Sequence, residues 1–204
     1  MRPTSFDRLA GLCAILAGIG GFLYAVAFVI VSRNDPELSD LLSALLLLVN
    51  AILSSAALVG IYGRVHGANP GLALWGLLLG LGGQLGAAMH GGYDLANLIH
   101  PLGEAAPGPG DLPFQADPRG LMTFGLTGLA ILVLASLIGR TQGFPGRLAS
   151  LGSLLGVLLV VIYVARLTVL DATNPLLLAP VLVTGFIVSP LWYLWLGREL
   201  RQGG

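Results

Sequence analysis

Residues 41–63 read LLSALLLLVNAILSSAALVGIYG, a stretch without a single charged side chain. A bilayer core is about 30 Å thick and a helix rises about 1.5 Å per residue, so roughly 20 apolar residues cross it. Five other stretches are long and apolar enough to do the same: 9–32, 71–97, 120–139, 148–170 and 175–197. The sequence therefore predicts an all-α fold, a polytopic membrane bundle of six transmembrane helices that forms a single domain over residues 1–204.

The composition supports a membrane protein and argues against several other classes. Apolar residues make up 55% of the chain and charged residues only 10%, whereas a soluble domain carries about 25% charged residues. The formal net charge is zero and all ten basic residues are Arg, so the sequence does not predict a nucleic-acid partner. The six spans leave no room for a soluble catalytic domain. Cys13 is the only cysteine, and no motif predicts a cofactor.

The distribution of Arg residues predicts the orientation, because cytoplasmic loops carry an excess of basic residues. If the chain crosses the membrane six times, seven Arg residues lie on the same side of it: Arg2, Arg8, Arg64, Arg140, Arg147, Arg198 and Arg201. The aromatic residues Tyr62, Trp75, Trp192 and Trp195 lie near the same side, as an interfacial belt would. We therefore expect both termini to be cytoplasmic. The Pro- and Gly-rich segment 100–118 is then an exposed loop on the outer side.

Glycine and proline residues predict how the spans pack. Glycine supplies 30 of the 204 residues, about twice its usual share of roughly 7%. In lipid, apolar burial does not draw helices together, so small residues let backbones approach. The glycines of span 71–97 predict a central helix that contacts other helices of the chain, with a homo-oligomer through the glycine-rich faces as the alternative. Pro180 and Pro190 predict a bend in the sixth span.

The ionisable residues inside the spans are the candidates for a functional site, because buried charges are costly in a membrane. In span 71–97, His90, Asp94 and Asn97 lie on one helical face at 100° per residue. Arg166 in span 148–170 lies at a similar depth, which makes Asp94 and Arg166 a candidate charge pair. Tyr93 and Tyr163 complete the predicted group of ligand-binding residues, which lies near the outer face.

Several functions are compatible with this group. The first is a non-enzymatic, transporter-like or ligand-binding bundle in which Arg166 and His90 hold a small polar or anionic ligand. The second is a membrane-embedded enzyme with a metal held by His90 and Asp94, although zinc catalysis usually needs three protein ligands and no third is evident. The third is a structural subunit of a larger membrane complex. A purely structural pairing of Asp94 with Arg166 would also explain the residues.

Residues His90–Pro101, together with the segment 117–125 that reads DPRGLMTFG, resemble small bacterial six-helix membrane proteins that are classed as domains of unknown function. The resemblance covers about the middle third of the chain and rests on short motifs. It implies a multi-pass protein of the bacterial inner membrane and implies no activity.

Overall fold

The computed structural model describes residues 3–100, 121–169 and 174–202, and these residues form helices and no strand. The long helices are α1 (Ser5–Val29), α2 (Pro36–Val65), α3 (Pro70–Ile99), α5 (Thr127–Ile138), α6 (Gly146–Thr168), α7 (Pro175–Val183) and α8 (Ser189–Gln202). Shorter helical turns are η1 (Val31–Arg33), η3 (Leu121–Leu126) and η4 (Thr184–Val188). The predicted loop beyond His100 lies outside the described residues, as do Arg2 and Arg119.

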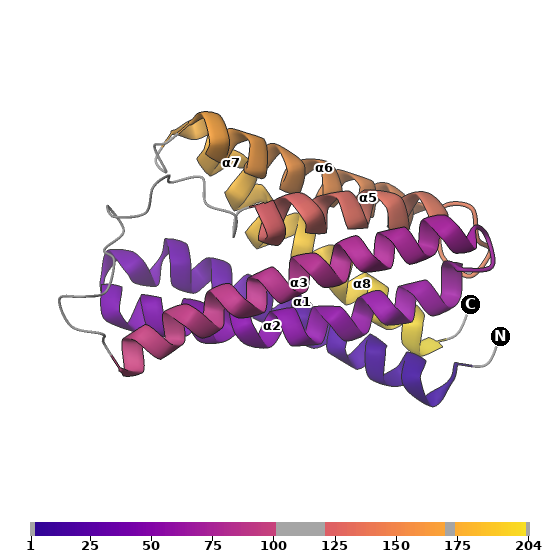
Figure 1. Ribbon diagram of the computed structural model, residues 1–204, viewed down its shortest axis with the longest axis horizontal. Coiled ribbons are helices and arrows are strands. Elements are labelled where there is room, and N and C mark those ends of the chain that lie inside the picture. The colour runs from indigo at the N-terminus through magenta and orange to yellow at the C-terminus, as the bar shows by residue number, and fades with distance from the viewer. Residues whose placement is uncertain (1–2, 101–120, 170–173, 203–204) are drawn as a thin grey trace.

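Among the described residues, six helical runs are long and apolar enough to cross a membrane: Ser5–Arg33, Pro36–Val65, Pro70–Ile99, Leu121–Ile138, Gly146–Thr168 and Pro175–Gln202. Each overlaps one predicted span, so the predicted fold class is confirmed. The long helices run close to the long axis of the molecule, and both termini lie at one end (Figure 1). We call this the terminal end, and we call the other end, where α3 finishes and α7 begins, the opposite end (Figure 1).

Three of the helices begin with the same local signal, an Asp or Asn followed by Pro. Asp35, Asn69 and Asn174 each cap a helix, accepting a hydrogen bond from a backbone N–H of the first turn. A proline follows each cap at the first helical position, where a missing N–H costs nothing. The starts of α2, α3 and α7 are thus fixed by two residues each.

The sixth span, where a bend is predicted, contains a π-helical segment. The helix changes at Thr184–Val188 from α to π geometry and back, and the Ser189 N–H bonds the Thr184 carbonyl, five residues earlier. Pro190 follows directly and supplies no N–H for the preceding turn, which is a known cause of such a local change. A second π-helical segment, Leu121–Leu126, opens the fourth span.

Helix α1 sorts its residues by size. The buried face of α1 consists of small residues, namely Ala10, Gly11, Ala14, Ala17, Gly18 and Gly20, plus Ala25 and Ala27. Its large residues, such as Leu12, Ile19 and Phe22, are exposed on the outside. A water-soluble bundle would bury the large residues instead, so this arrangement fits a bundle surrounded by lipid.

Two reciprocal pairs of glycines mark places where helix backbones touch. A Cβ on Gly11 of α1 would lie 2.6 Å from the carbonyl oxygen of Gly197 in α8, and one on Gly197 would lie 2.5 Å from that of Gly11. Gly128 of α5 and Gly156 of α6 have the same reciprocal relation, at 2.9 and 2.8 Å. No larger residue fits at these four positions without separating the helices.

The α3 helix lies between α2 and α5. Gly80 faces Leu58 of α2 and Ala130 of α5, while Gly83 lies against Thr127 of α5. Gly91, nearer the opposite end, lies against the α2 backbone at Ala44. These glycines therefore serve contacts within the chain, and a homo-oligomer through glycine-rich faces stays a prediction.

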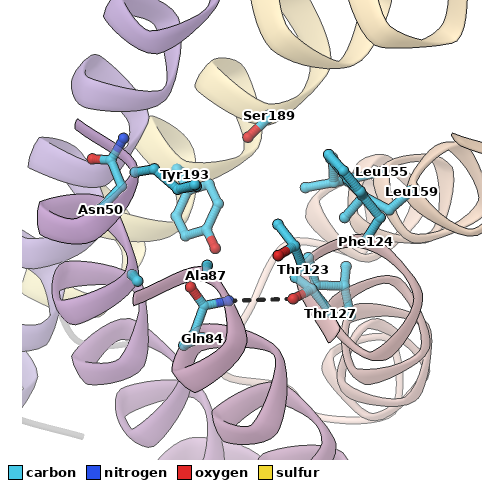
Figure 2. Close-up of a pocket in the computed structure, with 13 residues that line it drawn as sticks. Asn50, Gln84, Ala87, Thr123, Phe124, Thr127, Leu155, Leu159, Ser189 and Tyr193 are labelled. Carbon is cyan, nitrogen blue, oxygen red and sulfur yellow. Dashed lines mark hydrogen bonds between the residues drawn. The ribbon is translucent and has the colours of Figure 1, made fainter. Parts of the chain in front are cut away.

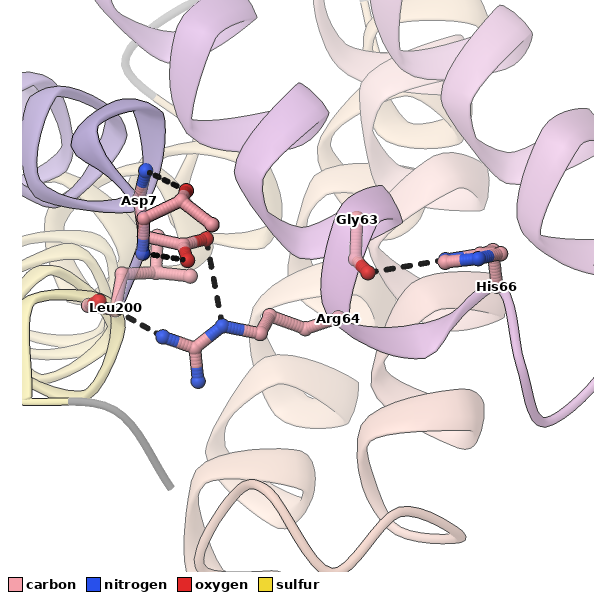
Figure 3. Close-up of polar contacts among 6 residues, drawn as sticks. Asp7, Gly63, Arg64, His66 and Leu200 are labelled. Carbon is pink, nitrogen blue, oxygen red and sulfur yellow. Dashed lines mark hydrogen bonds and ion pairs between the residues drawn. The ribbon is translucent and has the colours of Figure 1, made fainter. Parts of the chain in front are cut away.

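Arg64 joins helices at the terminal end (Figure 3). Its Nε donates to the Asp7 Oδ1 of α1 at 3.4 Å, and its Nη2 donates to the Leu200 carbonyl oxygen of α8 at 2.9 Å. The guanidinium also lies 6.0 Å from the ring centre of Phe144, a buried residue in the segment that connects α5 and α6. The Arg64 and Asp7 side chains are only 12% and 14% exposed. Arg64 thus connects α1, α2 and α8 with the turn between α5 and α6.

The aromatic belt differs from the prediction at Trp192. Trp75 is 52% exposed, as an interfacial tryptophan would be, but Trp192 is fully buried. Its ring contacts Tyr193 edge to face and packs beside Gly152 of α6. Trp192 is therefore a core residue, because the Gly152 position leaves room for an indole inside the bundle.

Replacing Gly83 by Ala should destabilise the bundle by about 1–3 kcal/mol, because the new methyl group would overlap the Thr127 hydroxyl and force the helices apart. Gly92 on the same helix is the matched control, since its Cβ position has no neighbour within 4 Å. Gly92→Ala should be neutral or stabilising by up to about 1 kcal/mol. Equal thermal midpoints for the two variants in detergent would contradict the close packing of α3 against α5.

Replacing Arg64 by Ala should lower the free energy of unfolding by about 1–3 kcal/mol, since it leaves the Asp7 carboxylate and the Leu200 carbonyl without this donor. Arg140→Ala provides the control, because Arg140 is exposed, and its effect should stay within about 0.5 kcal/mol. Titration of both proteins with SDS in mixed micelles measures the difference. Indistinguishable curves would mean that Arg64 does not connect the helices energetically.

Candidate functional site

His90 and Asp94 form an ion pair or hydrogen bond on α3. The His90 Nε2 lies 3.2 Å from the Asp94 Oδ2, across one helical turn, and the two side chains are 25% and 39% exposed. The other ring nitrogen, His90 Nδ1, is buried and has no hydrogen-bond partner among the described residues. If Nε2 carries the proton toward Asp94, the Nδ1 lone pair is the free acceptor of the ring.

Arg166 lies in the last turn of α6, toward the opposite end of the molecule (Figure 1). Its guanidinium stands over the Phe124 ring, 5.5 Å from the ring centre, in a cation–π contact. Tyr24 of α1 lies within range of the charges of both Arg166 and Asp94. Groups from α1, α3 and α6 therefore share one electrostatic environment toward the opposite end. A direct pair between Asp94 and Arg166 stays a prediction.

The other predicted residues have different surroundings. Asn97 is half-buried in the last turns of α3, and Tyr163 of α6 is half-buried with its ring packed against Gly125 of η3. Tyr93 is 49% exposed. We call the group of His90, Asp94, Arg166 and Tyr24 the polar cluster.

Within the described parts of the chain, no three His, Cys, Asp or Glu side chains lie close enough together to hold a metal ion. His90 and Asp94 supply two such groups, and zinc catalysis usually requires three. The metal-dependent enzyme stays a hypothesis from the sequence.

A cavity of about 150 Å³ lies in the middle of the bundle (Figure 2). Side chains of all the spans except α1 line it: Leu47, Asn50, Ala51, Gln84, Ala87, Thr123, Phe124, Thr127, Ile131, Leu155, Leu159, Ser189 and Tyr193. Six of these carry an amide or a hydroxyl group, and none carries a charge. The cavity is therefore an uncharged polar site with apolar walls.

The polar side chains of the cavity come from different helices. The Gln84 Nε2 of α3 donates to the Thr127 Oγ1 of α5 at 3.4 Å, and both residues are only 8% exposed. Tyr193 of α8 points its hydroxyl toward Gln84 in Figure 2. Asn50 turns its amide oxygen toward Gly20 of α1.

The two π-helical segments adjoin this cavity. Thr123 and Phe124 belong to η3, and Ser189 follows directly after η4. A π turn shifts the register of a helix by one residue, so it re-aims the side chains that follow, and such turns are frequent at functional sites. Here Thr123 and Ser189, at the two π-helical segments, both line the cavity.

Phe124 connects the cavity with the polar cluster. Its ring contacts the Arg166 guanidinium, and its side chain also lines the cavity. On the terminal side of the cavity, the bundle is filled by buried apolar side chains such as Leu58, Leu134 and Trp192. Polar groups thus extend from the opposite end only as far as the middle of the bundle.

A search of protein-family models, curated proteins and solved structures finds no significant match to this chain. The six apolar helices define the class on their own: the chain is a multi-pass α-helical membrane protein.

Proposed function

We propose that this protein is a non-enzymatic, ligand-binding or transporter-like bundle of the bacterial inner membrane. Its polar cluster lies near the outer face and receives a small polar or anionic ligand. The observation that carries the proposal is the His90–Asp94 pair on α3, with a His90 Nδ1 that is buried without a partner among the described residues, together with the Arg166 guanidinium over Phe124.

The cost of charge in a membrane supports a functional cluster. A charged side chain in the hydrocarbon region costs at least about 2.5 kcal/mol even on the mildest scale. The chain keeps Asp94 and Arg166 half-buried within two of its six spans. Helices can pack into a bundle without charged side chains, so the presence of Asp94 and Arg166 favours a role in ligand binding.

The chemistry of the groups defines the ligand class. A guanidinium presents several N–H donors that match a carboxylate or a phosphate. One face of the Arg166 guanidinium lies over the Phe124 ring. The N–H groups along the edge of the guanidinium can therefore donate hydrogen bonds to an anion. His90, held by Asp94, offers a second polar contact. A small molecule with an anionic or strongly polar group fits these partners best.

The distribution of Arg supports the orientation. Arg64, Arg140 and Arg147 belong to the terminal end, together with both termini, and the rule for basic residues favours the cytoplasm for that end. The polar cluster then faces the periplasm, where small solutes arrive from outside.

The test is thermal unfolding of the purified protein in detergent with sodium acetate, sodium phosphate or glycine, each compared with sodium chloride at equal ionic strength. A ligand at 100 times its Kd stabilises the folded protein by about 2.7 kcal/mol. We expect at least one of the three to raise the midpoint of the wild-type protein. Arg166→Gln should abolish this shift, because it removes the charge and the donor fork.

Arg140→Gln is the control, since it removes an exposed Arg at the other end of the bundle, and it should keep the shift. The proposal fails if none of the three solutes stabilises the wild-type protein, or if the Arg166 variant responds as strongly as the Arg140 variant.

A further inference from the structure

The central cavity differs chemically from the polar cluster. Thirteen side chains from five spans line it, and every polar group among them is neutral: two carboxamides, three aliphatic hydroxyls and one phenol. A charged ligand would enter this space without a counter-charge, which is strongly unfavourable in an apolar medium. The lining therefore selects against ions.

A hydroxyl in the lining has no protein partner. The Thr123 Oγ1 is buried and has no hydrogen bond to any of the described residues. Buried polar atoms are nearly always bonded, so each exception calls for an explanation such as a bound molecule. Thr123 lines the cavity, so a molecule bound there is a candidate for this partner.

Gln84 adds a second binding group. One of its N–H donors is used on Thr127, at the long distance of 3.4 Å. A carboxamide has two N–H donors and a carbonyl oxygen that accepts. Together with the Thr123 and Ser189 hydroxyls, it presents donors and acceptors on several sides of the same small space (Figure 2).

The size of the cavity limits the ligand. A volume of about 150 Å³ equals the space of about five water molecules at about 30 Å³ each. Drug-sized ligands occupy pockets of at least about 300 Å³. The cavity is therefore large enough for a few non-hydrogen atoms.

We propose that the cavity between α2, α3, η3, α6 and α8 is a binding site for a small uncharged molecule that carries an amide or hydroxyl groups. The site goes beyond the proposed function, because its lining includes no residue of the polar cluster. Such a molecule satisfies the Thr123 hydroxyl and the free positions of Gln84, while its short carbon skeleton lies against Leu155 and Leu159.

The test is saturation-transfer NMR on the protein in lipid nanodiscs, with acetamide and glycerol as probes. Ala87→Leu is the blocking variant, since Ala87 lines the cavity and a leucine side chain would fill much of it. Ala96→Leu on the same helix is the control, because Ala96 is exposed. We expect a signal from at least one probe with the wild type and with Ala96→Leu, and none with Ala87→Leu.

Thr123→Val is a second variant that does not depend on filling the cavity. It keeps the shape and removes a hydroxyl that has no hydrogen bond to the described residues, so the thermal midpoint should not fall. The affinity for the bound probe should fall about three- to tenfold, as expected for one lost hydrogen bond.

The inference is overturned if neither probe binds the wild type, which would mean that the cavity holds water alone, or if Ala87→Leu and Thr123→Val bind as the wild type does. These outcomes are separate from those of the proposed function. Arg166→Gln should lose its response to anions and keep acetamide or glycerol binding. Anion binding without acetamide or glycerol binding would refute only the cavity site.

Discussion

The hydrocarbon core of a membrane offers no hydrogen bonds, and this constraint shapes the whole molecule. Every backbone N–H and C=O must be bonded within the chain, so the spans are helical throughout. Apolar burial gives lipid-surrounded helices no reason to associate, so association depends on close packing. The chain achieves it with glycines: Gly11 meets Gly197, and Gly128 meets Gly156, with backbone against backbone.

The same constraint explains where the polar side chains lie. At the terminal end, Arg64 finds the Asp7 carboxylate and a carbonyl oxygen, so its charge is compensated. Toward the opposite end, Asp94 has His90 beside it, and Arg166 lies over an aromatic ring. The middle of the bundle contains only neutral polar groups. Polarity thus decreases from the ends to the centre, which favours a charged ligand toward the opposite end and a neutral one inside.

The six spans could be predicted from the sequence because the length and hydropathy of each stretch define them. Which side chains face the interior depends on how each helix is rotated about its axis, and the sequence does not reveal this. The caps at Asp35, Asn69 and Asn174 were readable as Asp–Pro and Asn–Pro pairs. The π turns were not, since no residue type specifies them, although Pro190 indicated a bend. Tyr24, Thr123 and Ser189 were missed because single hydroxyl residues are common in apolar helices. Trp192 was assigned to the interface from its position along the chain, but the space beside Gly152 makes it a core residue.

The central claim is that six helices cross the membrane, with the terminal end in the cytoplasm and the polar cluster outside. The most direct measurement fuses alkaline phosphatase, which is active only in the periplasm, after Gly204 and, in a second protein, after Asn34 in the turn between η1 and α2. The account predicts an inactive fusion at Gly204 and an active one at Asn34. Activity at Gly204, or its absence at Asn34 in a stably expressed fusion, would contradict it.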